Sequence, residues 1–229
     1  MGKMMKKTVR IFLALLLLCI LWACRQEPEE SVVTTNETNP ALTIVAVGDS
    51  LTAGMGVAEN ESYPALLEQR LKSEGYDVRV INAGVSGETT SGTLARLDWV
   101  LTLKPDIVIL ETGANDGLRG LDLGLVRENL KKIVQILREE EITIVFTGMR
   151  MVWNLGPVYT SDFNRIYPDI AEDNDLIFMP FFLEGVATKS ELNIKDGIHP
   201  NQKGYAIIVD NLLPVVKQAL VAAEKRDRK

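Results

Sequence analysis

Residues 42–50 read LTIVAVGDS, an almost continuous apolar run that ends at Gly48, Asp49 and Ser50. The run lacks the regular polar alternation of a half-exposed strand, so it predicts a β-strand that is buried on both faces. Such strands occur in parallel sheets whose two faces are covered by helices. The glycine and the aspartate that end the run are typical of a tight turn. The stretch therefore predicts the fold class, and it places a serine just beyond the first strand.

Short apolar runs of the same kind recur along the chain and alternate with helical patterns. The expected strands are Leu42–Val47, Val78–Ile81, Ile107–Leu110, Ile142–Phe146 and Leu176–Met179. The expected helices are one opening at Ser62-Tyr63-Pro64, one striped by Leu94, Leu97 and Leu101, one striped by Val126, Leu130, Ile133, Val134 and Leu137, one over Ser161–Asp173, and a pair after Asn201 broken at Pro214. This alternation predicts an α/β fold, a flavodoxin-like three-layer α/β/α sandwich with a five-stranded parallel sheet.

The first residues of the chain are typical of an export signal. Residues 1–10 carry lysine and arginine but no acid, and an apolar run follows that is shorter than the roughly 20 residues of a membrane-spanning helix. Residues 1–23 are therefore expected to be a signal peptide. Residues 24–41 are acidic, threonine-rich and punctuated by proline, which predicts a flexible tether. The folded domain is expected over residues 42–229.

The end of the apolar run, LWAC, resembles a bacterial lipobox, although Trp22 stands where a smaller residue is usual. This resemblance implies that Cys24 is lipidated and anchors the chain to the cell envelope. Because Gln26 is not the aspartate that favours inner-membrane retention, the outer membrane or its periplasmic face is the expected location. An ordinary signal peptide cut near Ala23 is the alternative.

Composition limits the partners that the chain can have. Its formal net charge is −6, and removal of residues 1–23 would take away lysines and arginine but no acid. A negatively charged protein is not expected to bind nucleic acid, whose backbone is itself anionic. Cys24 would be the only cysteine left, so no disulfide is expected within the domain. The oligomeric state is left open.

Polar residues gather where the predicted strands end. They are Gly48-Asp49-Ser50-Leu51, Asn82-Ala83-Gly84 and Gly113-Ala114-Asn115-Asp116, and a fourth group, Asp196-Gly197-Ile198-His199-Pro200, precedes the last helical pattern. The carboxyl ends of parallel strands meet at one edge of a sheet, where active sites lie. His199 is the only histidine, so it is the one histidine that could activate Ser50 as a nucleophile. Asp196 is close enough in sequence to orient its ring.

These four groups resemble the consensus blocks of the SGNH (GDSL) hydrolase superfamily, in the same order. The runs GDSLTAGMGV, INAGVSGETTSG, RLDWVL, PDIVILETGANDGLRG and FFLEGVA are similar to its bacterial arylesterase, thioesterase and lysophospholipase branch. The resemblance implies a serine esterase without metal or cofactor, acting on acyl esters through an acyl-Ser50 intermediate. It makes Ser50 the nucleophile, His199 the base and Asp196 the residue that orients it. Gly84, Asn115 and the N–H of Ser50 are then the implied oxyanion donors.

Two other functions stay open at this point. The same site could serve a carbohydrate O-deacetylase, or the chain could be a surface lipoprotein that binds a ligand without catalysis. The loops after the strands favour an apolar acyl pocket, lined by Met55, Leu118, Val152, Trp153 and Leu155. Near the nucleophile, Asp49 is expected to brace the turn, and Glu111 to be a polar group with its hydrogen bonds satisfied.

Overall fold

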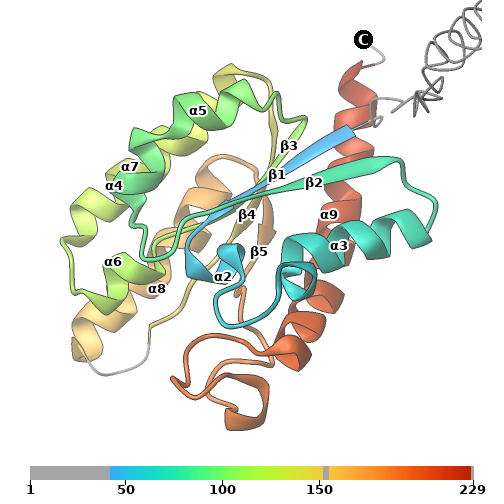
Figure 1. The fold of residues 1–229 in the computed structure, drawn as a ribbon. Coiled ribbons are helices and arrows are strands. Elements are labelled where there is room, and N and C mark those ends of the chain that lie inside the picture. Colours follow the sequence, from blue (N-terminus) through green and yellow to red (C-terminus); the bar gives the residue numbers. More distant parts are fainter. Residues whose placement is uncertain (1–41, 152–154, 228–229) are drawn as a thin grey trace, which may run out of the picture. The chain divides into compact units, whose positions relative to one another are not determined.

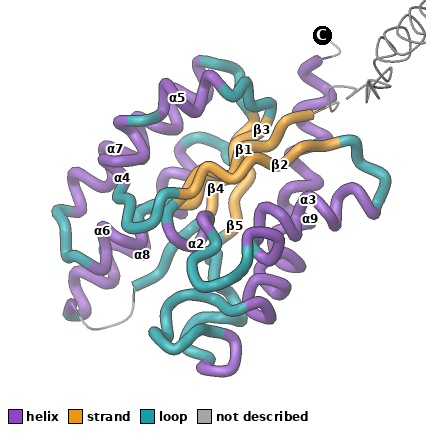
Figure 2. Tube along the Cα trace, in the orientation of Figure 1, coloured by secondary structure: helices purple, strands orange, loops and turns teal. Residues whose placement is uncertain are grey.

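A computed structural model describes residues 42–151 and 155–227. Its centre is a parallel sheet in the order β2-β1-β3-β4-β5 (Figures 1 and 2). The strands are β1 (Leu42–Gly48), β2 (Val78–Gly84), β3 (Ile107–Glu111), β4 (Thr143–Thr147) and β5 (Ile177–Met179). The predicted five-stranded parallel sheet is confirmed. β2 runs three residues further than expected because Asn82, Ala83 and Gly84 pair with the end of β1.

Helices cover both faces of the sheet, as predicted (Figure 1). One face carries α3 (Tyr63–Ser73) and α9 (Gln202–Asp227), and the other carries α4 (Thr90–Ala95), α5 (Leu97–Thr102), α7 (Leu123–Glu139) and α8 (Pro157–Asp173). Two short helices, α2 (Ser50–Ala53) and α6 (Ala114–Leu118), follow the carboxyl ends of β1 and β3. Single 3-10 turns lie at Glu59–Glu61 and Ser190–Leu192.

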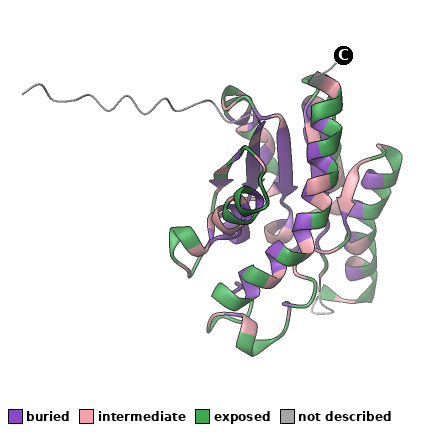
Figure 3. Ribbon diagram, turned by 90° about the vertical axis from the view of Figure 1, so that its right-hand side faces the viewer, coloured by how far each residue is buried: buried purple, intermediate pink, exposed green. Residues whose placement is uncertain are grey.

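The core lies between the sheet and the two helix layers. The middle of β1, from Ile44 to Val47, and most of β3, from Ile107 to Leu110, are fully buried. Figure 3 shows the buried residues along the strands and on the sheet-facing sides of the helices. Burial on both faces explains why these strands are continuous apolar runs. The ends of β1 and β3 are thus held rigidly, and they carry the polar residues of the candidate site.

Two helix predictions were wrong. The stripe of Leu94, Leu97 and Leu101 lies on two short helices, α4 and α5, which are separated at Arg96. The expected pair after Asn201 is one helix, α9, with Pro214 inside it. Proline removes one backbone hydrogen bond. Pro214 is exposed, so water can hydrate the carbonyl that it leaves free, while buried leucines on either side keep the helix on the sheet.

Helix α9 also has the length and the hydropathy of a membrane-spanning segment over Gln202–Arg226, with a mean hydropathy of 1.6. One face of the helix, which includes Ile208, Leu212 and Val216, is buried against the domain. Packing of this face therefore explains its composition without a membrane.

The predicted signal peptide, Cys24 and the tether lie outside the described residues, so these assignments stay predictions.

Candidate active site

Ser50 lies at the point where β1 passes directly into α2. The carbonyl of Ser50 accepts from the N–H of Gly54, and the side chain of Asp49 accepts from the N–H of Leu51 at 2.9 Å, which caps the helix. The turn is tight: a Cβ at Gly48 would lie 2.1 Å from Thr52 Oγ1 and 2.4 Å from the carbonyl oxygen of Glu111. Only glycine fits there. The expected brace by Asp49 is confirmed by its capping bond.

The structure brings Ser50 together with the predicted base. Ser50 Oγ lies 2.8 Å from His199 Nε2, although the two residues are 149 positions apart. His199 Nδ1 lies 2.6 Å from Asp196 Oδ2. The other oxygen of this carboxylate, Oδ1, accepts from the N–H groups of Ile198 and His199 at 3.0 and 3.1 Å. One loop therefore positions both the ring and the carboxylate behind it.

The charge of Asp196 sets the tautomer of the ring. Burial alone would raise the pKa of Asp196, but hydrogen bonds from the Ile198 N–H, the His199 ring and the His199 N–H outweigh it and lower the pKa. An ionised carboxylate only accepts hydrogen bonds, so Nδ1 carries a hydrogen. In the neutral ring Nε2 then has a free lone pair, and the Ser50 hydroxyl donates to it. This arrangement suits removal of the serine proton.

Asn115 lies on α6, beside the nucleophile turn. Its Nδ2 donates to Asp49 Oδ2 at 3.0 Å, which leaves the second hydrogen of the amide for another acceptor. Burial raises the pKa of Asp49 to about 6. The hydrogen bond from the Leu51 N–H, the interaction with His199 and the hydrogen bond from Asn115 act in the opposite direction and lower it. Asp49 thus caps α2 with one carboxylate oxygen and orients the Asn115 amide with the other.

Gly84 does not fit the donor assignment in this geometry. Its N–H donates to Asn82 Oδ1 at 3.0 Å and is therefore already used. A Cβ at Gly84 would lie 2.2 Å from the backbone nitrogen of Ala53. A glycine is needed here because β2 packs directly against α2, which is a structural reason for the residue.

Gly87 lies in the turn after β2 and was not among the residues expected from the sequence. The N–H of Val85 donates to the carbonyl of Gly48 at 2.9 Å, so this turn lies against the end of β1. The carbonyl of Gly87 accepts from Arg119 Nη2 at 2.8 Å, next to α6. Among the described residues, no acceptor is found for the N–H of Gly87 or for that of Ser50. The available sequence signal was a glycine shortly after a strand, and in the structure its φ is positive (78°), which favours glycine.

Glu111 is a buried carboxyl group beneath the nucleophile turn. Its Oε2 accepts from Thr52 Oγ1 at 2.8 Å and from the N–H of Asp49 at 3.3 Å. Within the described residues its Oε1 has no hydrogen-bond partner, so the expectation of a fully satisfied group was wrong. Burial, with the nearby charge of Asp49, raises the pKa of Glu111 well above its usual range.

The apolar loop residues are only partly described. Met55, Leu118 and Leu155 are exposed apolar side chains, with 38 to 46% of their surface accessible. Val152 and Trp153 lie outside the described residues. The acyl pocket therefore stays a prediction.

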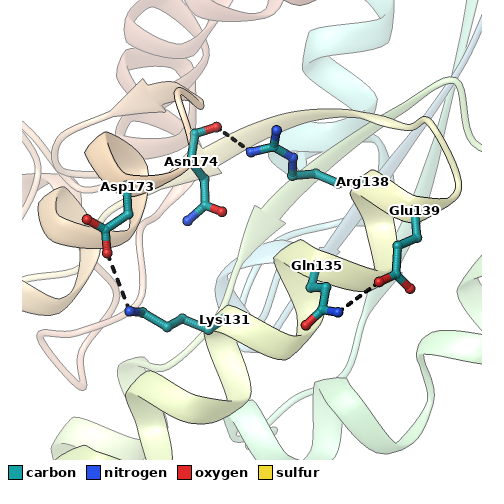
Figure 4. Close-up of a pocket in the computed structure, with 6 residues that line it drawn as sticks. All are labelled: Lys131, Gln135, Arg138, Glu139, Asp173 and Asn174. Atoms are coloured by element: carbon teal, nitrogen blue, oxygen red, sulfur yellow. Dashed lines mark hydrogen bonds and ion pairs between the residues drawn. The ribbon is translucent and has the colours of Figure 1, made fainter.

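A surface hollow of about 530 Å³ lies elsewhere, between α7 and α8 (Figure 4). Its side chains bond mainly to one another: Lys131 to Asp173, Gln135 to Glu139, and Arg138 to the carbonyl of Asn174. It includes the final turns of both helices, which precede β4 and β5, and so lies away from the carboxyl ends of the strands. No cluster of three potential metal ligands is found in residues 42–151 and 155–227.

Comparison with known proteins agrees with this geometry. Residues 46–207 match the model of the GDSL-like lipase/acylhydrolase family. The chain belongs to this family. It is 38% identical to esterase TesA of Pseudomonas aeruginosa, over 83% of this chain and 95% of that one, and 35% identical to thioesterase 1/protease 1/lysophospholipase L1 of Escherichia coli, over 78% and 85%. A crystal structure of TesA matches with a TM-score of 0.74 at 39% identity, covering 77% of this chain and 99% of that one.

The family and these relatives identify the chain as a serine acyl-ester hydrolase with the three-layer α/β/α fold of SGNH hydrolases. The carbohydrate deacetylase and the non-catalytic lipoprotein are not favoured.

Glu111→Gln tests the buried acid. An acid whose pKa is raised by folding contributes stability that is fully present below its unfolded pKa, about 4.3 for glutamate, and is lost as the pH rises through the folded pKa. Glutamine keeps the acceptor for Thr52 and does not titrate. We expect the melting temperature of the wild type, minus that of the variant, to fall as the pH rises above the unfolded pKa of about 4.3. A difference that stays constant with pH would show that Glu111 is ionised throughout.

Proposed function

We propose that Ser50 attacks the acyl carbonyl carbon while His199 Nε2 takes the hydroxyl proton. The observation that carries this proposal is the 2.8 Å contact between Ser50 Oγ and Nε2, with Asp196 behind the ring. The protonated ring then returns the proton to the leaving alcohol or thiol, and an acyl-Ser50 ester remains. Water, activated by the same ring, hydrolyses this ester and restores the serine. Asp196 stays ionised and stabilises the positive ring.

The oxyanion of each tetrahedral intermediate needs donors that are fixed in place before the reaction. We propose the N–H of Ser50, the second amide hydrogen of Asn115 and the N–H of Gly87. Ser50 begins α2, so its N–H has no acceptor within the helix. Gly87 replaces Gly84 in this proposal, because the N–H of Gly84 is donated to Asn82.

The proposed substrates are carboxylic esters, thioesters and lysophospholipids, which share an acyl carbonyl and a leaving group that needs a proton. The names of the relatives support this range: one is an esterase, and the Escherichia coli protein is named as both thioesterase and lysophospholipase. The exposed apolar side chains of Met55, just after α2, and of Leu118, at the end of α6, suit a hydrocarbon chain.

We also propose that the chain is exported and tethered to the cell envelope through a lipid on Cys24. The support is the basic and apolar N-terminus followed by LWAC. The tether of residues 24–41 would let the domain reach substrates near the membrane surface.

Ser50→Ala tests the nucleophile. Without the hydroxyl no acyl-enzyme can form, so turnover of p-nitrophenyl butyrate should fall by about 10⁴-fold or more. Ser73→Ala, at the exposed end of α3, is the matched control and should keep wild-type turnover. A fluorophosphonate should label the wild type and the control but not Ser50→Ala. A phosphonate adduct that maps to another serine by mass spectrometry would contradict the assignment.

Asn115 separates an oxyanion donor from a residue that only stabilises its turn. Asn115→Ala should lower turnover by about 10²- to 10³-fold, and it should also lower the melting temperature slightly because the hydrogen bond to Asp49 is lost. Asn115→Asp replaces the donor with a carboxylate that repels the oxyanion, and it should be at least as inactive. If Asn115 only caps the turn, stability should fall by about 1 kcal/mol while turnover is retained. Near-wild-type turnover in Asn115→Asp would remove the residue from the site.

Cys24→Ala tests the anchor. The variant should lose its lipid and appear in the soluble fraction, with the activity per molecule unchanged, because Cys24 lies outside the catalytic domain. The measurements are intact-mass analysis and ester turnover of both proteins. Loss of specific activity in a soluble fragment that starts near Ala41 would contradict a purely tethering function.

A further inference from the structure

Arg96 and Glu88 form a nearly buried ion pair beside the candidate site. Arg96 Nε lies 2.7 Å from Glu88 Oε1, and Arg96 Nη2 lies 2.7 Å from Glu88 Oε2, so the two groups form a bidentate ion pair. Only 17% of the Arg96 side chain and 6% of the Glu88 side chain are exposed. Removing two charges from water is costly, and an apolar pair of similar size would often be at least as stable. Stability alone is therefore a weak reason for this pair.

The same guanidinium also contacts the ends of two strands. Arg96 Nη2 donates to the carbonyl of Ala83 in β2 at 2.8 Å and approaches the carbonyl of Gly48 in β1 at 3.4 Å. Gly48 is two residues before Ser50, and its carbonyl also accepts from the N–H of Val85. Arg96 thus ties the strand that carries the nucleophile to the strand that leads into the next turn.

Glu88 is the last residue of the turn Val85–Glu88, and its side chain connects the turn to Arg96. Its N–H donates to the carbonyl of Val85 at 3.1 Å, and its Oε2 also accepts from Thr93 Oγ1 at 3.0 Å. A Cβ at Gly92 would lie 2.8 Å from Cγ of Glu88, so the glycine makes room for the carboxylate stem. Arg96 therefore holds the end of the turn through Glu88, and it holds the strand just before the turn through the carbonyl of Ala83.

We propose that Arg96 and Glu88 are positioning residues that hold the turn Val85–Glu88, and with it the N–H of Gly87, at a fixed place relative to Ser50. This inference rests on the proposed function, in which that N–H binds the oxyanion. Neither side chain contacts Ser50 or His199 in the structure, so neither is a catalytic residue. They act by keeping a backbone donor in place before the charge develops, which is the condition for strong oxyanion stabilisation.

The position of Arg96 also explains why the helical stripe is interrupted. Arg96 lies between α4 and α5 with φ −108° and ψ 10°, which is outside the helical range. In this conformation its side chain reaches the strand ends. Its Nη1 is buried and has no hydrogen-bond partner among the described residues, and the guanidinium also lies over the ring of Trp99, 5.8 Å from the ring centroid.

Arg96→Met tests the proposal, since methionine keeps much of the apolar stem and removes every donor. We expect kcat and kcat/KM for p-nitrophenyl butyrate to fall together by about 10²-fold, with KM unchanged, because the lost interaction acts in the transition state. Arg127→Met is the matched control. It breaks an ion pair of 2.9 Å with Asp169 that is exposed and remote, and it should leave both constants unchanged.

Two further variants separate positioning from folding. Arg96→Lys keeps one charged donor but not the fork, and Glu88→Gln keeps an acceptor without charge, so each should lose less activity than Arg96→Met. All rates are taken per active site, titrated with a fluorophosphonate, at temperatures well below each melting point. The proposal would be overturned if kcat per active site were unchanged in both Glu88→Gln and Arg96→Lys. It would also be overturned if the variants contained fewer titratable active sites but kept the wild-type kcat at each of them.

The parallel Ser50→Ala measurement tells the two claims apart. If Ser50→Ala keeps its activity, the proposed function fails. If Ser50→Ala is inactive while Arg96→Met has wild-type kcat, only the positioning proposal fails.

Discussion

The hydrogen bond between Ser50 Oγ and His199 Nε2 is the contact on which the rest of the structure depends. It joins the end of the first strand to the loop before the last helix, 149 positions later, over 2.8 Å. This distance can persist only if both ends are rigid. β1 supplies one rigid end because its middle residues are fully buried between two helix layers. At the other end, the carboxylate of Asp196 accepts from the backbone and the ring of the same loop. The continuous apolar strands therefore contribute to the chemistry by positioning the reacting side chains, not by contacting them.

A second constraint lies beneath the nucleophile, where polar groups are buried at a cost to stability. Glu111 leaves one oxygen without a partner in the described structure, and Arg96 leaves one nitrogen. Buried polar atoms in natural cores usually have hydrogen-bond partners. Atoms without partners beside the site therefore indicate that the geometry of the site was favoured over stability. Glu111 supports the turn through Thr52 and the N–H of Asp49, while Arg96 ties the ends of β1 and β2. Both groups restrain the backbone on which the proposed oxyanion donors lie.

Local patterns predicted much of this arrangement. Buried parallel strands have a composition that helices and exposed strands do not share, so all five appeared as apolar runs with small errors at their ends. The placement of Ser50 and Asn115 at one edge of the sheet followed from the motifs at the strand ends, and that of His199 from the motif before the last helix; their catalytic roles stay proposals. The missed features depend on contacts between distant segments. Gly84 must be a glycine because the backbone of Ala53 in α2 lies against it, although the bond from its N–H to Asn82 is local. The break at Arg96 reflects partners in two strands. Pro214 fits inside α9 because its packed neighbours compensate for the lost hydrogen bond.

Acyl transfer through Ser50 can be tested most directly by trapping the intermediate. The enzyme would be mixed with excess p-nitrophenyl butyrate, quenched in acid during turnover, digested and examined by tandem mass spectrometry. We expect a butyryl ester on Ser50. The ester should accumulate further in a His199 variant with Asn115 intact, provided that the replacement still permits slow acylation but cannot activate water for deacylation. A butyryl group on any other side chain, or rapid turnover with Ser50 never modified, would contradict acyl transfer through Ser50.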